Sequence, residues 1–211
     1  FQGNTTMSTI PKLFFDRVTR DPHTVSVWTE TPAEDDQFFL RHTATQKTDG
    51  PTGWSALSNG EIHKQVAGLA RRLQSFGVGR GVPVAILANT SVRWTAVDMA
   101  IQCLGGITVG LYPTLLPKQI QYQLEHAEAK VLIVEDEAQA HRCFPIIDEL
   151  FDLQHILSLH ANNLVPQLTP AMPDLAWLSE QIENVRIEDV CTYIYTSGTT
   201  GPPKAVVLNH H

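Results

Sequence analysis

The chain has 211 residues, 43% of them hydrophobic, and a formal net charge of −7 at pH 7. This length and apolar content are enough for one domain with its own core. The negative balance and the lack of a basic cluster argue against nucleic-acid binding, and no apolar run approaches the roughly 18 residues of a membrane span.

The N-terminal residues indicate where the folded part of the chain begins, and the cysteines indicate the cellular compartment. Phe1-Gln2-Gly3 is similar to the remnant of a cleaved purification tag, so we interpret residues 1–6 as tag or linker and residues 7–211 as the folded part. The N-terminus lacks the charged and apolar blocks of a secretory signal. Cys103, Cys143 and Cys191 lie far apart and form no C-x-x-C pair. We therefore expect a cytoplasmic protein with neither a disulfide framework nor a metal site.

The N-terminal third is predicted to contain helices, a strand and a polar loop. An amphipathic pattern over residues 9–20 predicts the first helix, and residues 25–28 predict a short strand. Residues 30–53 are polar and are expected to form a hairpin or loop, with a buried strand at 38–40. Ser58-Asn-Gly-Glu61 is a capping box that begins a second helix, which Gly77 ends as a C-cap. Its predicted core stripe consists of Ile62, Val66, Leu69, Leu73 and Phe76.

From residue 83 onward, apolar strands alternate with helices. Strands are predicted at 83–88, 107–111, 131–134, 156–159, 190–195 and 205–208, and helices at 92–104, 117–127 and 137–150. Residues 160–190 are interpreted as a connector with a short helical piece at 175–178. Continuous apolar strands that alternate with helices predict an α/β fold, a doubly wound and mostly parallel sheet with helices on both faces.

Residues 195–204, Tyr-Thr-Ser-Gly-Thr-Thr-Gly-Pro-Pro-Lys, form a loop dense in hydroxyls and glycines that ends in a lysine. Glycines let consecutive N–H groups turn toward one centre, and such nests bind anions. Because the loop directly follows a predicted strand, it lies where ligands bind in parallel sheets. A polyphosphate fits this chemistry best. The chain has neither a Walker A sequence nor a G-x-G-x-x-G, and an ordinary hairpin turn is the alternative.

This loop resembles the phosphate-binding loop of the adenylate-forming (AMP-binding) enzymes, which include acyl-CoA synthetases, luciferases and peptide-synthetase adenylation domains. Ala205 stands where that family usually has glycine. The resemblance implies a loop that holds the β- and γ-phosphates of ATP, with Mg²⁺ bridging phosphate oxygens and no protein ligand to the metal. The implied phosphate-binding residues are Thr196, Ser197, Gly198, Thr199, Thr200, Gly201 and Lys204, of which Thr199 and Lys204 are the implied catalytic residues.

Upstream stretches within residues 55–209 resemble the acyl-CoA synthetase branch, and Tyr112-Pro113-Thr114 is similar to its long-chain fatty acid members. The resemblance implies an ATP-dependent acid–thiol ligase that activates a fatty acid as acyl-adenylate and transfers it to CoA. Fatty acid, ATP and CoA are then the partners, and a long-chain substrate suggests loose membrane association.

Enzymes of this family are much longer, so we expect residues 7–211 to be the N-terminal subdomain of the AMP-binding large domain, inactive alone. An adenylation domain for amino or aryl acids and a non-catalytic binding module on the same scaffold stay open as alternatives.

Overall fold

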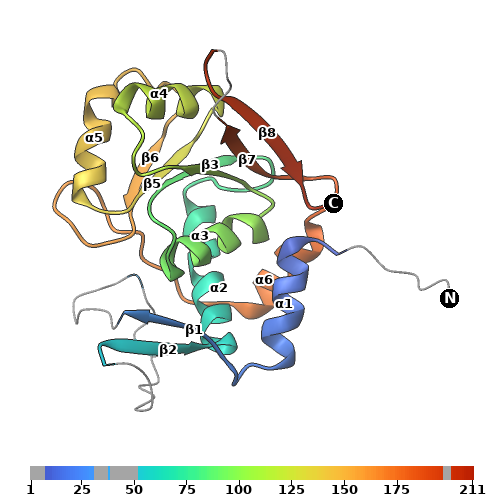
Figure 1. Cartoon of the computed structure of the whole chain (residues 1–211). Coiled ribbons are helices and arrows are strands. Elements are labelled where there is room, and N and C mark those ends of the chain that lie inside the picture. The colour runs from blue at the N-terminus through green and yellow to red at the C-terminus, as the bar shows by residue number, and fades with distance from the viewer. Residues whose placement is uncertain (1–7, 31–37, 39–51, 197–200) are drawn as a thin grey trace.

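The computed structural model describes residues 8–30, 38, 52–196 and 201–211. These residues form a two-stranded ribbon, a six-stranded sheet and helices on both faces of that sheet (Figure 1). The elements in chain order are α1 Ile10–Arg20, β1 Val25–Glu30, β2 Trp54–Ser58, α2 Asn59–Ser75, β3 Pro83–Leu87, α3 Val92–Cys103, β4 Ile107–Leu111, α4 Pro117–His126, β5 Val131–Val134, α5 Glu137–Ile147, β6 His155–Ser158, α6 Leu175–Asn184, β7 Val190–Thr196 and β8 Lys204–Asn209.

The main sheet has the strand order β6-β5-β3-β4-β7-β8. All neighbouring strands are parallel except β7 and β8, which form an antiparallel hairpin. The chain leaves β3 toward β4 and then returns past β3 to β5. Because crossover connections are right-handed, the helices of these two opposite steps lie on opposite faces of the sheet. The strand order therefore reverses at the boundary between β3 and β4, which is the topological switch point of the sheet.

Alternate residues of the central strands pack into two separate hydrophobic cores, one on each face of the sheet. Val84 and Ile86 of β3 pack with α2, α3 and α6, whereas Ala85 and Leu87 of the same strand pack with α4 and α5. Side chains of a strand alternate between its faces, so a strand covered on both sides is apolar throughout. The predicted doubly wound, mostly parallel α/β fold is therefore confirmed.

Helix α2 begins and ends as its sequence predicts. The Ser58 hydroxyl accepts from the Glu61 backbone N–H at 3.3 Å, and the Glu61 carboxylate accepts from the Ser58 N–H at 2.6 Å. Gly77 has φ +82°, a left-handed conformation that glycine adopts without strain, and Val78 N–H then bonds back to the Leu73 carbonyl at 3.1 Å. The predicted stripe is buried except for Phe76, which is partly buried against the same core.

Other elements differ from the prediction. Strand β2 was not expected; it forms because its residues pair antiparallel with β1. Helix α6 is longer than the predicted 175–178, since Asp174 caps it and Leu178 and Ile182 continue its buried face. Helix α5 stops at Ile147 instead of residue 150, and turn bonds replace the helical ones beyond it. The predicted strand at 38–40 lies outside the described residues except for Phe38, which is fully buried.

Candidate functional site

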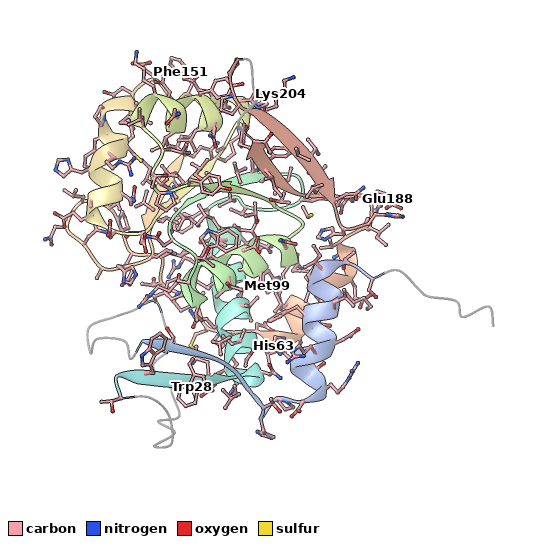
Figure 2. The ribbon with its side chains drawn as sticks, in the orientation of Figure 1. Trp28, His63, Met99, Phe151, Glu188 and Lys204 are labelled. Carbon is pink, nitrogen blue, oxygen red and sulfur yellow. The ribbon has the colours of Figure 1, made fainter. Side chains whose placement is uncertain are left out.

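The two ends of the predicted phosphate loop lie opposite each other on the β7–β8 hairpin. In the register of this pair Thr196 faces Lys204 and Tyr195 faces Ala205. Thr196 and Lys204 are both exposed, and within the described part of the chain Lys204 has no ion-pair partner. Figure 2 shows Lys204 at the end of β8 that lies nearest α4. A hydroxyl and an ammonium group are thus available to a ligand at the carboxyl end of β7.

The middle of the predicted site, residues 197–200, lies outside the described residues, so Ser197, Gly198, Thr199 and Thr200 stay predictions. Gly201 has φ +103°, and a Cβ built on it would meet nothing within 4 Å. Glycine is therefore favoured at position 201 by the left-handed backbone conformation and not by steric crowding around the Cβ position.

Helix α4 contacts both flanks of this loop. Tyr195 is 6% exposed, and its hydroxyl lies 2.9 Å from Nδ1 of His126 and donates to the Gln123 carbonyl at 3.2 Å. Burial, with the neighbouring Tyr122 and Tyr193, raises the Tyr195 pKa to about 12, so the phenol keeps its proton. Tyr122 and His126 were not predicted to belong to the site. Their spacing of four residues, which puts them on one face of a helix, was the signal available in the sequence.

A cavity of about 510 Å³ adjoins the hairpin at the point where the sheet switches direction. It is bounded by the carboxyl ends of β3, β4 and β7 and by one face of α3. Lining residues include Asn89, Trp94, Asp98, Tyr112 and Ile194. Open α/β sheets bind ligands in this crevice, so the cavity and the loop form one candidate site.

The inner wall of the cavity carries a partly buried carboxylate, that of Asp98. Oδ1 of Asp98 accepts from Thr108 Oγ1 at 2.7 Å and from Gln102 Nε2 at 3.0 Å. Burial raises the pKa of Asp98, and the two hydrogen bonds oppose that rise only in part. Oε1 of Gln102 is buried and finds no partner in the described part of the chain. Asp98 therefore gives this end of the cavity a hydrogen-bond acceptor.

Hydrogen bonds fix the segments that follow β3 and β4 at the mouth of the cavity. Arg142 of α5 donates to the Pro113 and Leu115 carbonyls, which fixes the turn after β4 and leaves Tyr112 67% exposed. Asn89, after β3, donates to Glu135, after β5, at 2.6 Å. The Tyr112-Pro113-Thr114 stretch thus forms a braced turn at the rim of the candidate site.

Outside this site, the described residues form neither a metal-binding cluster nor a disulfide. The described residues hold no group of three or more His, Cys, Asp or Glu suited to a metal ion. Cys103, Cys143 and Cys191 are buried and unpaired, and burial raises the pKa of each thiol. Among the helices that the structure describes, none has the length and apolar content needed to cross a bilayer.

Known proteins resemble this chain in sequence and in fold. The family described as AMP-binding enzyme matches residues 34–211. The long-chain-fatty-acid–CoA ligase FadD15 of Mycobacterium bovis is 33% identical over 159 residues, which are 74% of this chain and 26% of the relative. The long-chain-fatty-acid–CoA ligase ACSBG2 of Homo sapiens is 27% identical over 219 residues, which are 99% of this chain and 30% of the relative. The chain thus spans less than a third of either relative.

Solved structures of adenylate-forming enzymes share the fold. The anthranilate CoA ligase AuaEII in complex with anthranoyl-AMP matches with a TM-score of 0.66 at 21% identity, over 98% of this chain and 35% of its own. The luciferase-like enzyme of the mealworm Zophobas morio matches with a TM-score of 0.67 at 17% identity, over 100% of this chain and 44% of its own. With a family match across most of its length, the chain belongs to the AMP-binding enzymes.

Proposed function

We propose that the intact protein is an ATP-dependent acid–thiol ligase that converts a long-chain fatty acid to its CoA thioester, and that residues 7–211 supply its phosphate-binding part. The observation that carries the proposal is the hairpin register that sets Thr196 against Lys204 beside the cavity at the sheet's switch point. The named activity of the curated relatives supports the fatty acid as substrate.

The proposed reaction joins two anions, so positioning and charge neutralisation are the main tasks. A carboxylate oxygen attacks the α-phosphorus of ATP and pyrophosphate leaves; the CoA thiol then displaces AMP from the acyl-adenylate. Thr196 and Lys204, with the predicted Ser197, Gly198, Thr199, Thr200 and Gly201, would bind the departing pyrophosphate. Lys204 would act as a fixed charge, because its side chain is exposed and has no ion-pair partner among the described residues.

Mg²⁺ fits this site as a partner of the phosphates. The Thr196 hydroxyl and the Lys204 ammonium at the loop ends suit phosphate oxygens, and the described residues offer no carboxylate cluster to hold the metal alone. When bound, Mg²⁺ would supply positive charge to the leaving pyrophosphate.

The curated relatives favour a long-chain fatty acid over an amino or aryl acid as the substrate. A long-chain product would bring the enzyme close to membranes, which would make its membrane association peripheral. The 211-residue chain by itself is proposed to be inactive, because it spans less than a third of its curated relatives.

The test uses the intact protein with MgATP, CoA and a panel of C8 to C18 acids set against amino and aryl acids. We expect AMP, pyrophosphate and acyl-CoA with the longer fatty acids, and a strong loss of rate in the Thr199→Ala/Lys204→Ala double variant. MgATP should also raise the melting temperature of the wild type, because a ligand that binds only the native state stabilises it. No MgATP-dependent stabilisation would favour a non-catalytic module, and turnover by the 211-residue chain would refute its inactivity.

A further inference from the structure

Both flanks of the phosphate loop are hydrogen-bonded to the same face of α4. On the upstream side the Tyr195 hydroxyl lies 2.9 Å from His126 Nδ1. On the downstream side Tyr122 donates its hydroxyl hydrogen to the Pro203 carbonyl at 3.1 Å. Tyr122 and His126 are four residues apart, so one turn of helix sets the spacing between the two contacts.

Each contact is adjacent to a proposed phosphate-binding residue. Tyr195 directly precedes Thr196, and the Pro203 carbonyl belongs to the peptide unit whose nitrogen is that of Lys204. Thr196 and Lys204 already face each other across the hairpin. The α4 contacts therefore set the position of the hairpin end relative to the sheet, and the hairpin register sets the two residues relative to each other.

The direction of the His126 contact depends on the tautomer of the imidazole ring, which the bond to Gln123 selects. The Gln123 carbonyl can only accept, so the Tyr195 hydroxyl gives its single hydrogen to that oxygen. His126 Nδ1 then donates to the hydroxyl. The three rings pack in a row: Tyr122 and His126 have centroids 5.7 Å apart, and His126 meets Tyr195 edge-on at 5.7 Å and 78°. Edge-to-face packing of this kind restricts ring rotation and preserves the hydrogen bonds.

We propose that Tyr122 and His126 are positioning residues of the phosphate site: they act through Tyr195 and Pro203 to hold Thr196 and Lys204 where pyrophosphate leaves. This inference rests on the proposed function of the same site. Preorganised donors cost no rearrangement during reaction, so losing an anchor should weaken binding of the triphosphate and leave the CoA step unchanged.

The test measures ATP–pyrophosphate exchange and acyl-CoA formation by the intact enzyme. Tyr122→Phe removes one hydroxyl without changing the ring, and His126→Ala removes the other anchor. We expect each variant to raise KM for MgATP by about two- to tenfold, the loss of one neutral hydrogen bond, with KM for CoA unchanged. His126→Asn should recover most of the loss, because its amide can donate from nearly the position of Nδ1.

Gln121→Ala is the matched control, since Gln121 lies on the same helix but bonds to Glu125 of that helix and to Glu149, which follows α5. Its KM for MgATP should equal that of the wild type. If Tyr122→Phe and His126→Ala behave like this control while the wild type is active, the positioning role is refuted and the ligase assignment stands. An intact wild type that exchanges no pyrophosphate overturns the ligase assignment, and the positioning role with it.

Discussion

Gly68 lies in the middle of α2, at a point where helix propensity and packing make opposite predictions. Replacing glycine by alanine inside a helix normally stabilises it by about 1 kcal/mol. In this fold, however, a Cβ at residue 68 would lie 2.6 Å from the Ala171 carbonyl oxygen and 2.9 Å from Pro170 Cβ. Ala171 N–H also donates to the Gly68 carbonyl at 3.0 Å. The segment can move away only by losing that hydrogen bond.

The packing cost is the larger of the two effects. Overpacking costs about 1–3 kcal/mol, and a weakened backbone hydrogen bond adds roughly 0.5–1.5 kcal/mol. After the gain in helix propensity, Gly68→Ala should lower the unfolding free energy by about 0.5–3.5 kcal/mol. Residues 170–171 belong to the connector between β6, at the sheet edge, and β7. The strain would therefore act on the segment that leads into β7, the strand that ends at Thr196.

Urea unfolding of the chain, followed by circular dichroism, measures this change. The control is Gly79→Ala, because a Cβ there would meet nothing within 4 Å and its backbone is not left-handed. The control should stay within about 0.5 kcal/mol of the wild type. A Gly68→Ala variant as stable as the wild type, or more stable, would show that α2 and the connector do not approach as closely as described.

Three further substitutions test burial, charge and exposure. His63 is 4% exposed and packs edge-on against Phe15, and this burial lowers the pKa of its imidazole. The neutral His63 therefore contributes its full stability above the unfolded pKa of 6.5, and this contribution is lost as the pH falls through the lowered pKa of the folded state. His63→Phe should therefore reduce the loss of unfolding free energy between pH 7.5 and 5.5, and equal losses in both proteins would contradict this. Burial raises the Asp98 pKa, so its contribution is present at low pH and lost as pH rises through the raised value. Asp98→Asn should thus stabilise the chain at pH 8 by on the order of 1 kcal/mol, a gain that shrinks in acid; a gain that does not depend on pH would rule out charge burial as its cause. Lys204→Ala should change the unfolding free energy by less than about 0.5 kcal/mol, because the ammonium is exposed without an ion-pair partner in the described part of the chain; a loss above 1 kcal/mol would mean that Lys204 stabilises the hairpin.

Elements with strong local patterns could be read from the sequence alone. The capping box at Ser58 and Glu61, the stripe of α2 and the apolar runs of β4 and β5 carry their own geometry, because caps and side-chain periodicity depend on neighbours a few residues away. The order of these elements predicted the doubly wound sheet. The motif at 195–204 predicted a phosphate site, and three of its predicted residues, Thr196, Gly201 and Lys204, lie within the described part of the chain.

Only the tertiary structure decided which distant residues contact the two ends of that motif. Strand β2 forms through pairing with β1, and α6 extends because Leu178 and Ile182 meet the core, and neither event has a local signal strong enough to predict it. The row formed by Tyr122, His126 and Tyr195 joins residues up to 73 positions apart in the chain (195 − 122). Such contacts depend on how strands are ordered across the sheet, which the spacing of residues within a single element does not encode.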